Sequence, residues 1–526
     1  MGRIIGIDLG TTNSCVAVME GTDPVVIHNQ EGGRTTPSMV AFSEGGDVLV
    51  GAPAKRQAVT NPRRTVHSAK RLIGRKSGSA EVDRLKQTMP YEIAVAQNGD
   101  AWIRVGDRTF APEEVSAHVL EKMRTVAEDY LGEAVSEAIV TVPAYFDDVQ
   151  RQATKDAGLL AGLTVRSILN EPTAAALAYG LHQDKDGVYA VFDLGGGTFD
   201  ISILRAQAGV FEVLATNGDT TLGGDDFDQM LVHKLVAEFM AAEALDLTGD
   251  PVALQRLRDA AERAKHELSS ALNTDINLPF VAVGAAGPKH LIREVSRSEL
   301  ELLVAPLLAR LEAPCRRALS DARLTEADIT SVVLVGGMTR MPAVQAKVEE
   351  IFKRKPSRGV NPDEIVAMGA AIQSGMMDGD GAMAEMVLLD VTPHALGIRA
   401  AGGRFAPVIP AQTTIPTRET KVFATTEDNQ ELVTLEVYQG SAPEVKDNRH
   451  LGTFTLGDLP RGPRGSLRVE VAFTVDADGI VSVDAKELTT GKATSIRIDG
   501  ASGLSKNQID EMSQKRTGQF PKLIRR

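Results

Sequence analysis

Two short stretches of the chain carry the same pattern of residues, one suited to binding and transferring a phosphate. The segments IIGIDLGTTNS (4–14) and YAVFDLGGGTFD (189–200) each run from an apolar strand into Asp-Leu-Gly and then into glycine and threonine. A turn of this kind offers backbone N–H groups to an anion, and its glycines let the backbone approach closely. Two such turns that face each other would hold a polyphosphate from both sides.

A metal ion fits between the two turns. Asp8 and Asp193 end the two strands and place one carboxylate each beside the polyphosphate. Mg²⁺ prefers oxygen ligands and keeps most of its waters, so two carboxylates that bind partly through water suit it. The hydroxyls of Thr11, Thr12 and Thr198 add contacts to phosphate. One glycine turn alone is more often only a turn, but the pair, each after an apolar strand, favours nucleotide binding.

Two further glycine pairs support a nucleotide site. Gly336-Gly337 closes the apolar run of VVLVGGMTRMP (332–342) before a helix, a good place for a nucleotide sugar or base. Gly223-Gly224 stands in TLGGDDFD (221–228). The chain has no GxxxxGK[ST] segment, which excludes a P-loop enzyme. The twin hairpins instead match the actin-like (ribonuclease H-like) plan of sugar-kinase-type ATPases, with two lobes around a cleft.

Length, net charge and cysteine content limit the number of domains, the partners and the compartment that can be expected. The chain has 526 residues, a formal net charge of −13 and two cysteines, Cys15 and Cys315. This length predicts more than one domain, and the negative charge argues against a nucleic-acid partner. Two cysteines are typical of a reducing compartment. Because neither a secretory signal nor an apolar run of about 18 residues is visible, we expect a cytoplasmic protein without a membrane partner.

The order of expected elements divides the chain. Residues 1–375 alternate strand-like and helix-like segments, which predicts a layered α/β domain. Residues 376–389 predict a linker that is rich in Gly and Asp at its start. Strands are expected at 3–8, 138–142, 189–193 and 331–335, and helices at 112–131, 148–161, 171–180, 225–244, 251–272 and 297–322.

In residues 390–502 the spacing of apolar residues changes to every second position. Apolar residues alternate with polar ones, so that Leu467, Val469, Val471, Phe473 and Val475 share one face, and the turn DADG (476–479) leads back. This pattern predicts an all-β sandwich. Residues 503–526 predict a short helix at 506–513, capped by Ser505, and then a basic tail.

Several long motifs together carry a family resemblance. They include GIDLGTTNSCVAV, AIVTVPAYFDD, LNEPTAAALAYG, VFDLGGGTFDISI, NGDTTLGGDDFD, LVGGMTRMP and VLLDVTPHALGI. From Met1 to about Met512 the chain resembles the DnaK family, the heat-shock protein seventy chaperones. The resemblance implies an ATPase domain that uses ATP/ADP and Mg²⁺, coupled to a sandwich that binds extended apolar peptide.

The resemblance also implies roles for residues of the ATPase domain. Lys70 would reach the γ-phosphate and stabilise charge that develops in phosphoryl transfer; without the resemblance it would be interpreted as a solvated helix lysine. Glu171 and Asp200 would orient the attacking water and metal waters, and which of them acts as a base stays open. With Asp193 and Thr198 these form the catalytic set, and Thr198 also matches a threonine that phosphorylates itself in some members.

The remaining nucleotide contacts follow by motif position. Glu262, Lys265 and Ser269 resemble the family's adenosine contacts, although their spacing alone indicates only a polar helix face. His266 is either a stacking residue or a surface histidine. The full nucleotide-binding set is Gly10, Thr11, Thr12, Asn13, Gly195, Gly196, Gly197, Thr198, Gly223, Gly224, Glu262, Lys265, Ser269, Gly336, Gly337, Arg340 and Asp363.

In the sandwich, seven positions match residues that line or arch over the family's peptide channel. The lining positions are Ile398, Phe423, Val433, Leu435 and Val469, and for any single one of these membership of the sandwich core is about as good an interpretation. The two arch positions are Ala401 and Thr426. In the linker, Val387, Leu388, Leu389 and Asp390 form either the first strand of the next domain or an apolar latch that docks on the ATPase domain with ATP.

The sequence departs from the family in three places. Only a stub of the helical lid is present, so Arg464 lacks the lid carboxylate it would pair with. The small Ala401 predicts a looser arch over the peptide. Ser167 replaces a basic residue at a place where the J-domain co-chaperone binds, which leaves the response to that partner open.

Three functions compete at this point. The first is an ATP-dependent chaperone for unfolded polypeptides, served by a J-domain co-chaperone and a nucleotide exchange factor. The second is a small-molecule kinase of the actin-like fold, against which the second domain argues. The third is an ATP-gated peptide-binding scaffold that has lost chaperone cycling.

Overall fold

The structure is a computed structural model. It describes residues 3–183, 186–285, 287–357, 359–378, 386–425, 427–457, 459–488, 491, 493–497 and 503–519. Thr426 and the side chain of Ala401 lie outside the described part, as do 379–385 of the expected linker and 520–526 of the expected tail.

The first lobe is built on a mixed sheet around β1 (Ile4–Asp8). β1 pairs in parallel with β11 (Glu137–Val142) and antiparallel with β2 (Asn13–Glu20). Ile5 and Ile7 are fully buried on one face, which α3 (Pro112–Leu131) and α4 (Asp148–Leu160) cover. The sheet order is β12-β11-β1-β2-β3, completed by β3 (Asp23–Val26), β12 (Thr164–Asn170) and β4 (Thr36–Pro37).

The second lobe repeats this plan around β13 (Gly187–Leu194). β13 pairs antiparallel with β14 (Phe199–Gln207) and in parallel with β18 (Ser331–Val335). Asp8 stands opposite Cys15 in the first hairpin, and Asp193 stands opposite Asp200 in the second. The expected pair of Asp-Leu-Gly hairpins is therefore present, one in each lobe. The next strand of this sheet is β15 (Val210–Asp219).

Two helices join the lobes. α12 (Ile365–Asp378) packs on the β1 sheet, α5 (Glu171–Gln183) packs on the β13 sheet, and the two helices lie against each other. A Cβ added to Gly369 would lie 1.8 Å from the Ala174 carbonyl oxygen, so only glycine permits this approach. α12 continues to Asp378 and includes the first residues of the expected linker.

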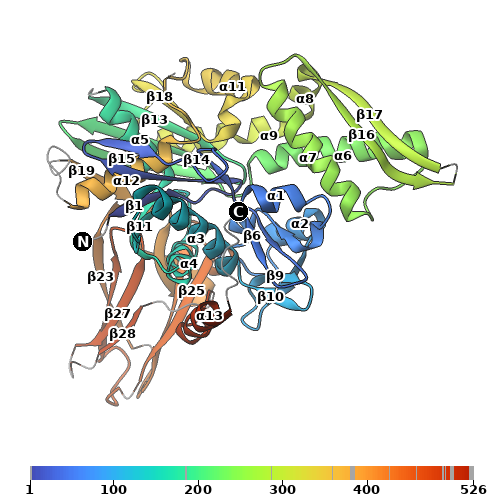
Figure 1. Cartoon of the computed structure of the whole chain (residues 1–526). Helices are drawn as coiled ribbons and strands as arrows, with labels where there is room; N and C mark the ends of the chain where they lie inside the picture. Colours follow the sequence, from blue (N-terminus) through green and yellow to red (C-terminus); the bar gives the residue numbers. More distant parts are fainter. Residues whose placement is uncertain are drawn as a thin grey trace.

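Each lobe carries an outer extension, and the two extensions face each other across the cleft. Figure 1 shows α1 and α2 in blue near α7 in green, with the long β16–β17 hairpin projecting beyond them. The first extension comprises α1 (Ala52–Gln57), α2 (Ala80–Thr88), β5 (Val40–Phe42), β6 (Val48–Val50), β7 (Thr65–Val66), β8 (Glu92–Val95), β9 (Ala101–Val105) and β10 (Arg108–Phe110). The second comprises α6 (Gly224–Glu243), α7 (Pro251–Leu268), β16 (Asn273–Gly284) and β17 (Gly287–Ser296).

The expected helix at 297–322 is broken into three. They are α8 (Arg297–Leu303), α9 (Ala305–Arg310) and α10 (Glu312–Asp321), followed later by α11 (Pro342–Phe352). Proline lacks an N–H and clashes with the preceding turn, so Pro306 near the start of α9 ends the run at Val304. α7 also ends earlier than expected, because Ser269 forms its C-cap.

The C-terminal strands form two antiparallel sheets that pack face to face, as expected for a sandwich. We call residues 387–497 the β region and residues 3–378 the two-lobed part. Leu396, Leu435, Val471 and Phe473 lie in the shared apolar core. One sheet has the order β21 (Arg404–Ile409), β20 (Ala395–Ala400), β24 (Val433–Gly440), β25 (Arg449–Leu456), and the other β23 (Thr417–Ala424), β26 (Arg468–Val475), β27 (Val481–Glu487), β28 (Ala493–Arg497).

The strand β19 (Val387–Val391) connects the two parts. It pairs in parallel with β15 of the second lobe and antiparallel with β22 (Thr414–Ile415) of the β region. The segment VLLD is therefore the first strand of the β region, as one interpretation of the sequence predicted, and it also pairs with the second-lobe sheet. Its release and docking with ATP stay a prediction. Figure 1 shows the β region, in orange and red, against the first lobe.

The last described helix, α13 (Lys506–Gln519), packs on the two-lobed part. Leu504, Ile509 and Met512 contact the apolar core of the first lobe. The Gly503 N–H donates to Asp100 Oδ2 at 2.8 Å. The expected cap is present, since Ser505 Oγ accepts from the Gln508 N–H, and the helix runs beyond the expected end at residue 513.

Candidate nucleotide site

A cavity of about 520 Å³ opens between the lobes, a size that suits a nucleotide. Both Asp-Leu-Gly turns contribute to its lining, together with residues from the outer extensions. Of the expected site residues, the lining includes Asp8, Gly10, Thr11, Thr12, Asn13, Lys70, Glu171, Asp193, Gly195, Gly196, Thr198, Gly224, Glu262, Lys265, Gly336, Gly337 and Asp363.

The two turns face each other closely. A Cβ added to Gly196 would lie 1.8 Å from Thr12 Oγ1, and one added to Gly197 would lie 2.7 Å from Thr11 Cγ2. The buried Thr12 hydroxyl has no hydrogen-bond partner among the described residues. An unpaired buried hydroxyl is costly, so this atom is free to meet a phosphate oxygen.

Lys70 is buried inside this cavity rather than solvated. It lies in a short 3₁₀ turn, Ala69–Arg71, which directs the side chain inward. Its Nζ donates to the Leu9 carbonyl oxygen at 2.6 Å and to Glu171 Oε1 at 2.7 Å. Glu171 is the first residue of α5, where the helix dipole favours a negative charge. The pair places one cation and one anion beside the first turn.

The carboxylates of the site carry more negative charge than Lys70 compensates. Burial, and then the charge of Glu171, raises the pKa of Asp8 to about 7 and the pKa of Asp200 to about 7. Burial also raises the pKa of Asp193 well above its usual range, with Glu171 contributing. Clustered buried carboxylates of this kind fit a divalent cation, whose charge would reverse these shifts.

The donor set fits a cation held mainly through water. Asp8 accepts a weak hydrogen bond from Thr141 Oγ1 at 3.4 Å, which leaves most of its lone pairs open. Across the described residues no group of three or more His, Cys, Asp or Glu side chains has the arrangement of metal ligands. Two carboxylates with several waters are the arrangement that Mg²⁺ accepts.

α7 and the Gly336-Gly337 turn form the side of the cavity at which the adenosine contacts are expected. Lys265 Nζ donates to Asp228 Oδ2 at 2.7 Å and to the Gly224 carbonyl oxygen at 3.1 Å. His266 is exposed and also borders the cavity, so the structure leaves both interpretations of this residue open. Gly336 has a φ of 79°, and a Cβ there would lie 2.7 Å from Asp193 Oδ1, so glycine is required.

Some expected residues lie outside the lining, as far as the described residues define it: Gly197, Asp200, Gly223, Ser269 and Arg340. Ser269 turns its hydroxyl to the Lys265 carbonyl oxygen at 3.1 Å. Arg340 is half-exposed and pairs with Asp363 at 2.6 Å. Asp200 accepts a hydrogen bond from the Tyr145 N–H at 3.1 Å, directly behind the cavity wall.

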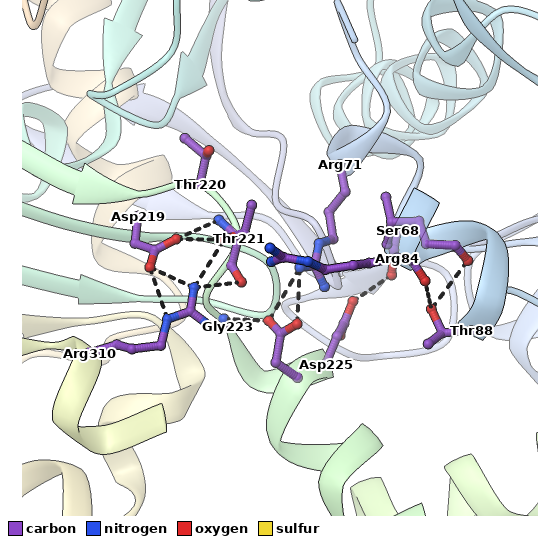
Figure 2. A network of polar contacts seen from close by, with 12 residues as sticks. Ser68, Arg71, Arg84, Thr88, Asp219, Thr220, Thr221, Gly223, Asp225 and Arg310 are labelled. Carbon is purple, nitrogen blue, oxygen red and sulfur yellow. Dashed lines mark hydrogen bonds and ion pairs between the residues drawn. The ribbon is translucent and has the colours of Figure 1, made fainter. Parts of the chain in front are cut away.

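Polar contacts close the cleft between the lobes, and sequence reasoning missed them (Figure 2). Ser68 Oγ donates to Asp225 Oδ2 at 2.6 Å, and Arg71 pairs with Asp226 at 3.1 Å. Lys55 pairs with Glu262 of α7 at 2.8 Å. The sequence offered one indication of these contacts: the acidic pair Asp225 and Asp226 in the motif NGDTTLGGDDFD could have been expected to meet basic residues of the other lobe.

Figure 2 also shows a second acidic group on the same rim. Arg310 of α9 pairs with Asp219 at 2.6 Å and donates to Thr221 Oγ1 at 3.0 Å. Asp219 ends β15, so this contact fixes the turn that leads into Gly223-Gly224. This contact lies within the second lobe and braces the side of the cleft on which Asp225 and Asp226 stand.

The strand β19 is held on the second lobe and beside the first. The Val387 N–H donates to the Gly209 carbonyl oxygen at 3.0 Å, and Leu388 packs into a core shared by both lobes. The buried Asp390 accepts hydrogen bonds at 2.9 Å from Asn170 Nδ2 and from Thr173 Oγ1. These partners lie at the start of α5, next to Glu171 of the nucleotide cavity.

The turn after β26 makes a second set of contacts between the β region and the first lobe. Asp478 Oδ1 accepts from Ser167 Oγ at 2.8 Å and from the Ile168 N–H at 2.9 Å, and Asp478 also pairs with Lys155. Asp148 Oδ1 accepts from the Val481 N–H at 2.7 Å. The sequence indicated the turn at 476–479 but not its docking partner.

The expected peptide-binding residues lie in one apolar cluster between the two sheets of the β region. Ile398, Leu435 and Val469 are buried in it, and Phe423 and Val433 pack against it partly exposed. Ile398, Leu435 and Val469 therefore belong to the sandwich core, which was one of the two interpretations of these positions. Phe423 and Val433 are the two whose side chains remain accessible.

One comparison with known proteins bears on the whole chain. A family model described as Hsp70 protein matches residues 4–520 of the 526 residues. Within the described residues, the helices are all too short or too polar to cross a membrane.

Proposed function

Because the chain belongs to the Hsp70 family, we propose that it is a chaperone in which ATP hydrolysis between the lobes controls peptide binding by the β region. The fold is the Hsp70 fold, with mixed α/β nucleotide-binding lobes and antiparallel sheets that form the substrate-binding domain. The proposed domains are 1–375 for the ATPase, 376–389 for the linker, 390–502 for peptide binding and 503–526 for the C-terminal helix and tail.

In the proposed site the phosphates lie between Gly10–Asn13 and Gly195–Thr198, and Lys70 faces the transferred group. Asp8 and Asp193 would hold Mg²⁺, which supplies positive charge to the phosphate oxygens as negative charge develops on them. Glu171, ion-paired with Lys70 at 2.7 Å, and Asp200, behind the wall, are the two candidates to orient water. Thr198 lines the same space and is the proposed site of phosphorylation.

The observation that carries the proposal is the shared strand β19. Its residues complete a sheet of the second lobe, and the same strand begins the β region. Asp390, at its end, is bound by Asn170 and Thr173 beside the nucleotide cavity. A change in the angle between the lobes must therefore alter the fit of β19, which gives the nucleotide a physical route to the β region.

Peptide would bind in extended form along the β region, with Ile398, Ala401, Phe423, Thr426, Val433, Leu435 and Val469 as the proposed contacts. Strand-like peptides are recognised through backbone hydrogen bonds and alternate side-chain pockets. A J-domain co-chaperone and a nucleotide exchange factor are the proposed partners. Ser167 is bound to Asp478 at 2.8 Å, so a partner that contacts Ser167 has to replace this bond.

The experiment is the release rate of a fluorescent apolar peptide from the full chain with ADP and with ATP. We expect ATP to accelerate release by an order of magnitude or more. If the peptide is released at the same rate in ADP and in ATP while ATP is still hydrolysed, the chain is an ATP-gated scaffold and not a coupled chaperone. Transfer of phosphate to a small-molecule acceptor instead of water would identify a kinase.

A further inference from the structure

A histidine of the first lobe is buried where the two lobes meet across the cleft. His67 borders the cavity together with Gln255 and Arg258, which belong to α7 of the second lobe. Its ring is in edge contact with the ring of Tyr91, with centroids 5.8 Å apart, and the Tyr91 hydroxyl donates to the His67 carbonyl oxygen at 2.6 Å. His67 is therefore a titratable group at the surface along which the lobes separate.

The hydrogen bonds of the next residue determine which ring nitrogen of His67 carries the hydrogen. Ser68 Oγ donates to Asp225 Oδ2 at 2.6 Å, because a carboxylate only accepts hydrogen bonds. A hydroxyl has one hydrogen, so Ser68 Oγ must accept its second contact, from His67 Nδ1 at 3.1 Å. Nδ1 therefore carries the hydrogen and Nε2 presents a lone pair. This Nε2 is buried and has no hydrogen-bond partner within the described part of the chain.

The groups that face the ring favour its neutral form. The charged ones are Arg258 and Glu262 of α7 and Lys55 of α1, and the last two pair with each other at 2.8 Å. Burial lowers the pKa of His67 to about 3, and the charge of Arg258 lowers it further than Glu262 raises it. Tyr91 stays neutral, because burial raises its pKa. The closed cleft therefore holds an uncharged imidazole.

We propose that His67 is a pH-sensitive switch of the cleft: its neutral imidazole lets the lobes close on the nucleotide, and its protonation opens them and releases ADP. This inference rests on the proposed function and adds a regulation of the same site. In the closed cleft a proton on Nε2 would form an N–H without an acceptor and a second positive charge facing Arg258 of the other lobe. Opening brings water to Nε2 and separates the two charges.

The backbone at Ser68 makes this arrangement depend on closure. Ser68 is buried and lies in the left-handed region, with a φ of 55° and a ψ of 24°. A non-glycine residue keeps such a conformation only where surrounding contacts hold it. One of these contacts crosses the cleft, to Asp225 of α6 (Figure 2). When the lobes separate this bond is lost, and residues 67–68 can relax and turn the imidazole toward water.

The two pKa values of His67 give the pH range of the effect and its size. The ring exposed by opening has the ordinary pKa of 6.5, whereas the ring in the closed cleft has a pKa of about 3. The closed form is therefore fully favoured above pH 6.5 and is increasingly disfavoured as the pH falls toward 3. From pH 7.5 to pH 5.5 the proton taken up by the open form favours opening about tenfold.

The measurement is the dissociation rate of a fluorescent ADP analogue from the full chain, by stopped flow at pH 5.5 and at pH 7.5. His67→Phe keeps a ring of similar size that does not titrate. His233→Gln is the matched control, because His233 is an exposed histidine of α6 that contacts Gln229 of the same helix. The ratio of the two rates is compared between the chains, since the carboxylates of the site contribute to it equally in all of them.

We expect this ratio to be about tenfold smaller in His67→Phe than in the wild type, and unchanged in His233→Gln. A second measurement needs no variant at the switch. The ring resonance of His67 in the wild type, followed by NMR, should titrate near pH 6.5 without nucleotide and should stay that of a neutral ring down to pH 5 with ADP bound.

Either of two results would overturn the inference: equal ratios in His67→Phe and the wild type, or a His67 resonance that titrates near pH 6.5 with ADP bound. If His67→Phe does not fold, the NMR titration of the wild type decides alone. Both measurements require a wild-type chain that binds ADP. A wild type that does not bind ADP would instead overturn the proposed function, so the two failures are distinguishable.

Discussion

Lys70 and Glu171 form an ion pair of 2.7 Å inside the nucleotide cavity, and both side chains are almost fully buried. The lysine comes from the outer part of the first lobe, and the glutamate begins the helix that joins the lobes. A buried pair of this kind contributes little net stability. Its position beside the first Asp-Leu-Gly turn supports the role proposed above for Lys70, charge stabilisation during hydrolysis.

Replacing Lys70 by Ala should lower the single-turnover rate of ATP hydrolysis by about 100-fold or more, because a preorganised cation is lost where charge develops. Lys122→Ala is the matched control, since Lys122 is equally buried but bonds to Gln30, away from the cavity. Both variants should lose thermal stability, and only Lys70→Ala should lose activity. A Lys70→Ala rate close to that of the control would remove Lys70 from the catalytic set.

Leu388→Asp with Leu389→Asp should uncouple peptide release from ATP. These residues lie in β19, and Leu388 packs into the core shared by the lobes, where an unpaired carboxylate is costly. Val387→Asp provides the control, because the Val387 side chain is 46% exposed on the same strand. Release should be equally slow in ADP and ATP for the double variant, and ATP-sensitive for the control. An ATP response that survives the double substitution would refute the latch.

Ser68→Ala should speed the dissociation of ADP about tenfold. The substitution removes the hydrogen bond to Asp225 across the cleft, and bonds to a charged acceptor are worth about 1.5–3 kcal/mol. Ser270→Ala is a suitable control, because the exposed Ser270 hydroxyl bonds only to its own helix end in the described structure. Stopped-flow release of a fluorescent ADP analogue measures both rates. Equal rates would mean that the Ser68 bond does not hold the cleft closed.

Glu113→Gln should stabilise the chain, and increasingly so as the pH rises. Burial raises the pKa of Glu113 to about 8, against an ordinary value of 4.5. Below pH 4.5 both folded and unfolded forms hold the proton and there is no penalty. Between pH 4.5 and 8 the unfolded chain has lost this proton while the folded chain still holds it. The free energy of unfolding of the wild type therefore falls as the pH rises, and the neutral amide of the variant avoids this loss.

The check is the difference in Tm between Glu113→Gln and the wild type at several pH values. The difference should widen from pH 5 to pH 8 and then level off. Glu44→Gln, at an exposed position, should show no such trend. A difference that is constant across this range would mean that Glu113 is ionised in the folded chain.

Local sequence patterns predicted the elements that depend on local rules. The two hairpins, the strand from 331 to 335 and the helix from 112 to 131 lie where the pattern placed them. In β26 the alternation put Val469, Val471 and Phe473 on the buried face, as found. The resemblance to the heat-shock protein seventy family is confirmed by the family match over residues 4–520.

The features that were not predicted depend on contacts between distant segments. The burial of Lys70, the row of ion pairs across the cleft and the docking of Asp478 on Ser167 all join residues far apart in the chain. Ser269 and Arg340 were placed by motif alone, and their side chains turn to Lys265 and Asp363. The helix expected from 297 to 322 is interrupted because Pro306, near the start of α9, cannot continue the preceding helix.

The strand β19 is paired along both of its edges, to β15 on one side and to β22 on the other. If β19 leaves, the edge of β15 from Val210 to Glu212 loses its partner and exposes unpaired N–H and C=O groups. Unprotected edges of this kind recruit strands from other chains. The paired strand β19 therefore also shields this edge, and variants that undock it should associate with one another as their concentration rises.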